Sequence, residues 1–313
     1  MPSDGLDLVL LGNLFVDDIV LHDGRTLMAE PGGAVLHAAL AARLWGARVG
    51  VVSVAGTDYP RAALEALAER GIDLAGVRQL GRPGGRAWLL YEAGVRRVIV
   101  HLDCPSHAEV SPTLADVPEH YWGARALHLA PMPLARQQEL AEGIFKWCGG
   151  NSLHARPLIS LDPYELLRDD NLELWPAVLK HVDAFFPSED EVRVRGDVVS
   201  VLRKIAGRRL RLVALKRGEH GGELLDLHFE TVTKWTSRAR EIVDATGAGD
   251  AFVGGFLAGW LEHGDAIRAI EQGIVAASFA IEDWGARALM ATTPEQAKAR
   301  WQQWFGSAVT ADQ

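Results

Sequence analysis

The sequence predicts an α/β fold in which a mostly parallel central sheet is covered by helices on both faces. Short aliphatic runs alternate with longer amphipathic stretches, and glycines lie between them. The runs at residues 6–11 and 49–54 are too short for helices and too uniformly apolar for half-exposed strands, so they are typical of buried parallel strands. No internal repeat or linker-like tract interrupts the chain, which predicts one domain over residues 1–313.

The first strand–helix–strand unit spans residues 6–54. Its helix is expected over residues 34–45, where Leu36, Leu40 and Leu44 recur every four residues and Gly46 follows as a C-terminal cap. The same pattern predicts further strands at residues 126–130, 158–162, 184–186 and 212–215. It predicts further helices at residues 60–70, 134–147, 190–194, 198–206, 249–262 and 265–281.

A hairpin breaks this alternation. Residues 86–92 and 96–103 read as two alternating strands separated by a short turn that contains Gly94. We expect it to project as a small β lid, to which residues 14–30 also contribute. Trp88 and Tyr91 could line a pocket under this lid, but alternating aromatic residues on a strand favour packing or a dimer contact.

Composition excludes several functional classes. The 32 Lys and Arg residues are outnumbered by 41 Asp and Glu residues, giving a net charge of −9, whereas binding to nucleic acid backbones usually needs a basic excess. Cys104 and Cys148 lack metal-ligand spacing and form no disulfide framework in sequence. No apolar run approaches the roughly 18 residues that a membrane helix requires. We therefore expect a cytoplasmic protein that binds neither nucleic acid nor membranes.

The segment most informative about chemistry is residues 243–255, VDATGAGDAFVGG. Gly247, Ala248 and Gly249 open a helix there, so unpaired backbone N–H groups and the positive end of the helix dipole suit a phosphate or a developing anion. Asp250 lies within this first turn. By itself such a carboxylate is more often structural, but beside an anion site it also suits proton abstraction from an attacking hydroxyl.

Two common nucleotide motifs are absent from the sequence. No G-x-x-x-x-G-K-[ST] sequence is present, and no G-x-G-x-x-G follows the first strand. A P-loop is therefore excluded and a dinucleotide-binding oxidoreductase is disfavoured.

The segment DATGAGDAFVGG resembles the C-terminal signature of the ribokinase family, also called PfkB-type carbohydrate kinases. Other segments resemble the remaining family motifs in the same order: residues 12–17, 31–33, 55–58, 162–163, 187–191 and 216–222. The resemblance covers nearly the whole chain. It implies a ribokinase-like sandwich with a small β lid, and an ATP-dependent phosphotransferase that acts on a hydroxyl of a small sugar, polyol or nucleoside.

The resemblance also implies roles for individual residues. Asp250 would be the general base, and the amides of Gly247, Ala248 and Gly249 would form the anion hole. These parts, together with Mg²⁺, supply the positioning and charge stabilisation that phosphoryl transfer requires. Glu191 would organise Mg²⁺ through water, although it also suits the acidic first turn of a helix.

Other matched positions would bind the two substrates. The acceptor would contact Asp17, Gly32, Gly33 and His37, and the nucleotide would contact Lys216, Arg217, Gly218 and Gly221. Asp244 corresponds to a loop that holds a monovalent cation in many relatives. Asp58 could also contact substrate, but Thr57-Asp58 before a Pro-containing helix start favours a helix cap.

Four positions depart from the family pattern: His37, Ser188, Lys216 and Ala245. His37 could face the pocket or be a buried, satisfied histidine, and the sequence does not favour either. Ala245 makes K⁺ dependence doubtful. The alternative function is a catalytically weak sensor of sugars or nucleotides on the same fold, which the retention of Asp250 disfavours. A homodimer through the lid is also expected.

Overall fold

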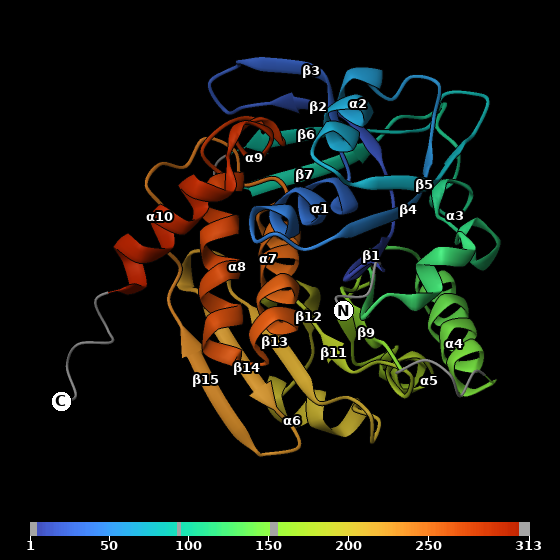
Figure 1. The fold of residues 1–313 in the computed structure, drawn as a ribbon, viewed down its shortest axis with the longest axis vertical. Coiled ribbons are helices and arrows are strands. Elements are labelled where there is room, and N and C mark those ends of the chain that lie inside the picture. Colours follow the sequence, from blue (N-terminus) through green and yellow to red (C-terminus); the bar gives the residue numbers. More distant parts are fainter. Residues whose placement is uncertain (1–4, 93–94, 151–155, 307–313) are drawn as a thin grey trace.

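A nine-stranded sheet forms the body of the computed structural model, which describes residues 5–92, 95–150 and 156–306 (Figure 1). The strand order is β15-β14-β13-β11-β9-β8-β1-β4-β5. All neighbouring pairs from β13 to β5 are parallel, and β14 and β15 add an antiparallel edge. The strands are β1 (Leu8–Leu11), β4 (Val49–Ala55), β5 (Asp73–Gln79), β8 (Ala126–Leu129), β9 (Leu158–Leu161), β11 (Ala184–Phe185), β13 (Leu212–Lys216), β14 (Gly222–Asp226) and β15 (Thr231–Trp235).

Helices cover both faces of this sheet, and each face has its own buried apolar cluster. One cluster joins the sheet to α1 (Ala34–Leu44), α2 (Arg61–Glu69), α7 (Ala248–His263), α8 (Ala266–Ala280), α9 (Arg287–Ala291) and α10 (Pro294–Phe305). The other joins it to α4 (Leu134–Gly150), α5 (Trp175–Leu179) and α6 (Val198–Ile205). The short helix α3 (His107–Val110) follows the second sheet. In the part of the chain that the structure describes, no helix has the length and apolarity to cross a membrane.

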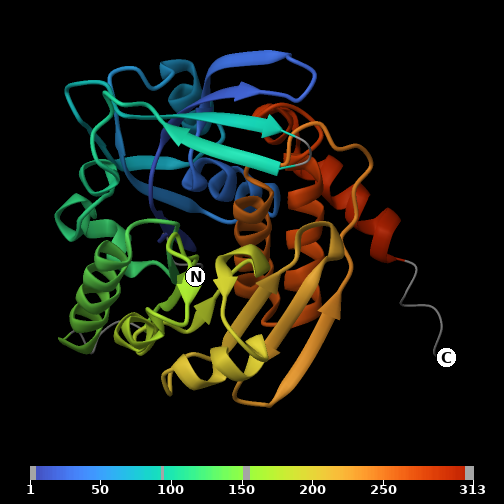
Figure 2. The same ribbon diagram turned by 180° about the vertical axis from the view of Figure 1, so that it is seen from behind.

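A second, four-stranded sheet has the order β3-β2-β6-β7 and lies at one end of the main sheet (Figure 2). Its strands are β2 (Phe15–Val20), β3 (Thr26–Gly32), β6 (Gly85–Glu92) and β7 (Val95–Val100). The buried Asp18 carboxylate binds these strands together: it accepts from Arg86 at 2.7 and 2.8 Å and from the Ala29 N–H at 2.8 Å. The sheet therefore has an ionic centre in place of an extensive apolar core.

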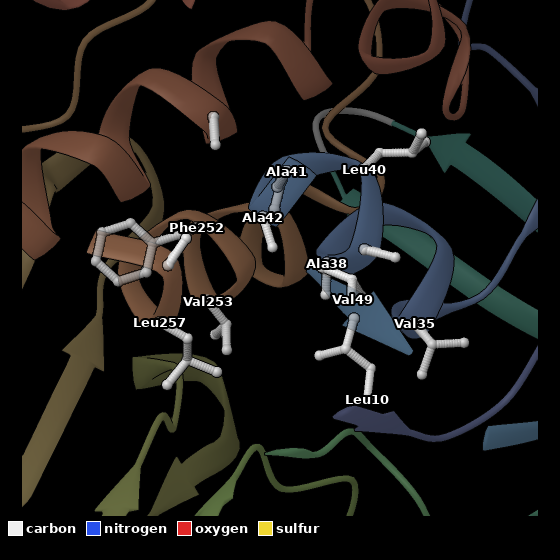
Figure 3. Close-up of a cluster of buried hydrophobic side chains, with 14 of the residues drawn as sticks. Leu10, Val35, Ala38, Leu40, Ala41, Ala42, Val49, Phe252, Val253 and Leu257 are labelled. Carbon is white, nitrogen blue, oxygen red and sulfur yellow. The ribbon is translucent and has the colours of Figure 1, made fainter. Parts of the chain in front are cut away.

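Helices α1 and α7 pack unusually closely because small residues lie where they cross (Figure 3). A Cβ atom added to Gly254 of α7 would lie 2.1 Å from the carbonyl oxygen of Ala38 in α1. Both helices begin at a glycine with positive φ, 104° at Gly33 and 73° at Gly247, a conformation that favours glycine over other residues. The close crossing thus brings two glycine-opened helix N-termini together.

The structure confirms the predicted α/β architecture and most of its elements. The six predicted strands and the helices α1, α2, α4, α6, α7 and α8 are present within a few residues of the expected bounds. The hairpin is also present as β6 and β7, and its turn residues 93–94 lie outside the described residues. Strands β5, β14 and β15 and the C-terminal helices α9 and α10 were not predicted.

Two local predictions are wrong. The expected helix at residues 190–194 is a 3₁₀ turn, Glu189–Glu191, followed by β12 (Val192–Arg193), which pairs with β10 (Leu167–Arg168). The Glu191 carboxylate accepts the Ser188 N–H at 2.7 Å, which closes a single turn. Asp58 does not cap α2, whose N-cap is Pro60. Its carboxylate accepts the Gly84 N–H at 2.7 Å and holds the entry to β6 instead.

Gly254→Ala should destabilise the protein because the added methyl group meets the α1 backbone. Overpacking of this kind typically costs about 1–3 kcal/mol, which urea unfolding would measure. Gly123→Ala is the matched control, since that exposed glycine has nothing within 4 Å of an added Cβ. Equal stability of the two variants would contradict the close crossing of α1 and α7.

Candidate active site

The N-terminus of α7 provides the candidate anion site. The left-handed Gly247 is its N-cap, and Asp250 lies in the first turn, half-buried. The Ala248 N–H makes only a long 3.4 Å contact with the Ala245 carbonyl. First-turn N–H groups have no acceptor within the helix, so the amides of Gly247, Ala248 and Gly249 are suited to bind an anion beside the Asp250 carboxylate.

Lys216 lies beside the same helix turn. Its Nζ is the nearest atom, at 3.4 Å, to the position that a Cβ on Gly249 would take. It donates to Oδ2 of Asp162 at 2.6 Å. Burial alone would lower the pKa of Lys216, but the carboxylates of Asp162, Glu191 and Asp250 outweigh burial and raise it. A charged ammonium group therefore adjoins the positive end of the α7 dipole, an arrangement that suits a bound anion.

Two carboxylates near Lys216, those of Asp162 and Glu191, are suited to bind a hydrated cation. Oδ1 of the buried Asp162 has no hydrogen-bond partner among the described residues. Glu191 uses Oε2 to accept the Ser188 N–H, so the structural interpretation of this residue is correct in part. The described residues contain no group of three or more His, Cys, Asp or Glu side chains able to hold a metal directly. Such sparse oxygen ligands fit Mg²⁺, which keeps several waters and is completed by substrate phosphates.

The loop from Lys216 to Gly222 borders a cavity of about 510 Å³. Gly218 and Gly221 both have positive φ, 51° and 82°, and a Cβ on Gly221 would lie 2.0 Å from the carbonyl oxygen of Trp235. The cavity continues over Trp235 to Ile270 of α8. Arg217 lines it too, but its guanidinium is paired with Glu223 at 2.9 Å and Glu189 at 3.3 Å.

Asp17 lies in β2, close enough to Asp250 for the two charges to interact. Its Oδ2 lies 1.9 Å from the position of an added Cβ on Gly32, so only glycine fits there. Burial raises the pKa of Asp17 to about 7, with Asp244, Asp18 and Asp250 adding to the effect and Arg96 opposing it. The hydrogen bonds found among the described residues do not include this carboxylate, which leaves it available to a ligand hydroxyl.

The side chain of His37, which belongs to α1, is fully buried between the N-termini of α1 and α7. Its Nδ1 lies 3.2 Å from the Gly33 carbonyl, and its ring occupies the space that a side chain at Gly247 would need, 2.1 Å from an added Cβ. Nε2 has no partner in the described part of the chain. His37 therefore packs as a buried histidine and still keeps one polar atom unsatisfied.

Asn13 was not predicted as a site residue. It follows β1, and both of its buried side-chain amide atoms lack partners among the residues described. Its backbone carbonyl lies 2.3 Å from the position of an added Cβ on Gly33. The signal in sequence was a polar residue directly after a buried strand, where open α/β sheets bind ligands.

Tyr91 and Trp88 behave differently from each other. Trp88 stacks on His101 with ring centroids 5.1 Å apart, in line with the expected packing. The Tyr91 hydroxyl instead makes hydrogen bonds to Asp244 and, at 2.9 Å, to the Thr246 hydroxyl. Tyr91 also packs against the buried cluster of Ile19, Leu21 and Leu89, as expected, but strand alternation did not reveal which loop its hydroxyl reaches.

An aromatic cluster joins Phe15 of β2 to Tyr164, which follows β9, through the ring of His107. The His107 ring makes edge contacts with Phe15 at 5.7 Å and with the exposed Tyr164 at 4.3 Å. Burial lowers the pKa of His107 to about 4, so its ring is neutral at physiological pH. Phe15 shares a strand face with Asp17 because alternate residues point the same way, and Tyr164 follows Asp162 by two residues.

Comparisons with known proteins show the family and the fold of the chain. The chain matches the family described as "pfkB family carbohydrate kinase" over residues 13–293. It is 32% identical over 288 residues to a cytidine kinase of Thermococcus kodakarensis, covering 90% of this chain and 98% of that protein. It is 27% identical to a nucleoside kinase of Methanothermobacter thermautotrophicus, covering 96% of this chain and 98% of that protein.

Solved structures share the fold. A putative ribokinase II from E. coli, in complex with ATP and Mg²⁺, has a TM-score of 0.74 at 20% identity and covers 95% of this chain and 99% of its own. A nucleoside kinase from Burkholderia thailandensis in complex with inosine has a TM-score of 0.73 at 18% identity, covering 96% and 99%. The predicted ribokinase-like fold is thereby confirmed.

Asp17→Asn should stabilise the protein at high pH and much less at low pH. The pKa of Asp17 is about 7 in the folded protein against an ordinary value of 3.8, so the folded state holds the proton more tightly than the unfolded chain. Ionisation of Asp17 therefore lowers the free energy of unfolding progressively between about pH 4 and pH 7, by up to roughly 4 kcal/mol.

Urea unfolding of both proteins across this pH range would measure the difference. Asp103→Asn, an exposed substitution of the same kind, is the control. A stability difference between Asp17→Asn and the parent chain that does not grow with pH would contradict the buried, ionisable state of Asp17.

Proposed function

The chain belongs to the pfkB family of carbohydrate kinases, and from that premise we propose that it transfers the γ-phosphoryl group of ATP to a hydroxyl of a nucleoside. The observation that carries the proposal is the meeting of Asp250, the α7 N-terminus and the Lys216 ammonium group at one point. A base and a concentrated positive field at the same point suit attack of a hydroxyl on a phosphoryl group.

The acceptor hydroxyl would lie between Asp17 and Asp250. Asp17 and the unpartnered amide of Asn13 would hold neighbouring hydroxyls of the acceptor. Asp250 would accept the proton of the attacking hydroxyl. At the same time the oxygen of that hydroxyl forms a bond to the γ-phosphorus, and the bond between this phosphorus and the departing ADP breaks. Gly32 and Gly33 allow the acceptor to approach the backbone closely.

The amides of Gly247, Ala248 and Gly249 would stabilise the charge on the transferred group, together with Lys216. When bound with the nucleotide, Mg²⁺ neutralises charge on the phosphates. Glu191 and Oδ1 of Asp162 are the carboxylate oxygens suited to hold its waters. The nucleotide base would enter the cavity of about 510 Å³ that the Lys216–Gly222 loop borders, and Arg217, Gly218 and Gly221 belong to the same loop.

We assign no monovalent cation to Asp244. Its carboxylate already accepts three hydrogen bonds, from Tyr91, the Thr246 N–H and the Gly285 N–H. Most of the acceptor positions of this carboxylate are therefore already occupied.

Two observations favour a nucleoside over a simple sugar as acceptor. Relatives that match over most of the chain include a cytidine kinase and a nucleoside kinase. The cluster of Phe15, neutral His107 and exposed Tyr164 offers aromatic faces beside Asp17, and aromatic rings bind nucleobases by stacking. A fructokinase of Klebsiella pneumoniae is also similar, at 28% identity, so sugars are the comparison acceptors.

The expected homodimer through the second sheet stays a prediction. Val98, Ile99 and Val100 are exposed on β7, which is an edge strand of that sheet. Exposed apolar edge strands are available for pairing.

Asp250→Asn should lower kcat about 10²- to 10⁴-fold, the usual contribution of general-base catalysis. Release of ADP in a coupled assay with nucleosides, sugars and polyols would measure it. Glu295→Gln is the matched control, because it removes a first-turn carboxylate from α10 and should leave kcat unchanged. A kcat of Asp250→Asn within tenfold of the parent value would refute the general-base role of Asp250.

The same assay also tests the alternative function, a catalytically weak sensor of sugars or nucleotides. Thermal stabilisation by nucleosides or ATP, without ADP release from any acceptor, would indicate a binding protein on the same fold.

Tyr164→Ala should raise the KM for a nucleoside about tenfold or more, since stacking on an aromatic ring contributes about 1–3 kcal/mol per base. The KM for ATP should stay the same. Tyr164→Phe keeps the ring and should keep the low KM. Cytidine, inosine and fructose would be compared as acceptors; an unchanged KM for both nucleosides, or activity on fructose alone, would rule out the aromatic cluster as the base site.

A further inference from the structure

Tyr91 connects the second sheet to the loop that opens α7. It lies near the end of β6, paired with Arg96 of β7. Its hydroxyl donates to Oδ1 of Asp244 and lies 2.9 Å from the Thr246 hydroxyl. The contact joins residues 153 and 155 positions apart in sequence, so it exists only when the sheet is docked on the main body.

Asp244 is the centre of this connection. Oδ1 also accepts the Thr246 N–H at 2.9 Å, and Oδ2 accepts the Gly285 N–H at 2.8 Å. The carboxylate is almost fully buried, and no Lys or Arg pairs with it in the described ranges. A buried carboxylate needs such donors, and the Tyr91 hydroxyl is the only one of the three that comes from a side chain.

The loop held in this way leads directly into the anion site. Thr246 precedes Gly247, whose positive φ sets the direction of the first-turn amides. Gly247 in turn packs on His37, next to the acceptor loop at Gly33. A shift of residues 244–246 would therefore move the amides and Asp250 together.

We propose that Tyr91 is a positioning residue: through Asp244 and Thr246, its hydroxyl holds the α7 N-terminus in the geometry for phosphoryl transfer and makes that geometry depend on docking of the second sheet. This inference rests on the proposed kinase function. It assigns to β6 a role in catalysis as well as in covering the acceptor. Small displacements of reacting groups are costly, which gives a single hydroxyl this influence.

Tyr91→Phe tests the role because it keeps the ring and removes only the hydroxyl. We expect kcat to fall about 10- to 100-fold, with the KM for ATP changed less than twofold. Tyr121→Phe is the matched control, since that buried hydroxyl donates to the Asp73 carbonyl at 2.8 Å, outside the site; it should leave kcat unchanged. A Tyr91→Phe protein with the kcat of the parent would overturn the inference.

A double-mutant cycle separates positioning from general stabilisation. If Tyr91 acts through Asp244, Tyr91→Phe should add little further loss of kcat in an Asp244→Asn background. Additive losses would mean that Tyr91 acts elsewhere. Thr246→Val removes the second hydroxyl in the contact and should lower kcat in the same direction, which keeps the test valid if Tyr91→Phe folds poorly.

Amide hydrogen exchange gives a readout independent of activity. Peptides that contain residues 244–250 should exchange their amide hydrogens faster in Tyr91→Phe than in the parent. Their exchange rates in Tyr121→Phe should equal those of the parent. Unchanged exchange in Tyr91→Phe would contradict the positioning role. Absence of phosphoryl transfer by the parent chain to every acceptor would refute the proposed function itself, whereas normal transfer by Tyr91→Phe would refute only the role of Tyr91.

Discussion

The crossing of α1 and α7 determines the geometry of the whole candidate site. Gly254 lies so close to Ala38 that no side chain fits between them, and both helices begin at glycines with positive φ. His37 fills the space between these two N-termini. The acceptor loop at Gly32 and Gly33 therefore lies next to the anion site at Gly247, although more than 200 residues separate them in sequence.

Buried carboxylates surround this crossing, and each is compensated differently. Asp18 is paired with Arg86, Asp162 with Lys216, and Asp244 with hydrogen-bond donors. Asp17 has no such compensation, and burial raises its pKa to about 7. A side chain that lowers stability in the free protein but faces a ligand site is typical of functional residues. Among the described residues, the lack of a paired cation or hydrogen-bond donor distinguishes Asp17 from Asp18, Asp162 and Asp244.

Residues far apart in sequence supply the charges of the site. Lys216, one of the positions that depart from the family pattern, comes from β13, whereas Asp162 follows β9. Sequence alone suggested a cation near the phosphates, but not the carboxylate that fixes it. Asn13 and Tyr91 were missed for different reasons. The position of Asn13 after a buried strand was a local signal, but its unpartnered amide is visible only in the structure. A hydroxyl that reaches a distant loop, as in Tyr91, has no local signature.

The amino-acid sequence by itself determined the alternating strands and helices and the glycine-opened α7, because these depend on hydrophobic periodicity and local backbone conformation. The general-base candidate Asp250 came from the resemblance of its segment to a family motif. Sequence reasoning failed at residues 190–194, where the chain passes from a single 3₁₀ turn directly into β12, and it left the two readings of His37 open. Only the tertiary structure decided that His37 packs under Gly247, that Lys216 binds Asp162 and that Tyr91 holds Asp244. Those contacts depend on how separate elements pack in three dimensions, and no pattern within a short stretch of chain encodes that packing.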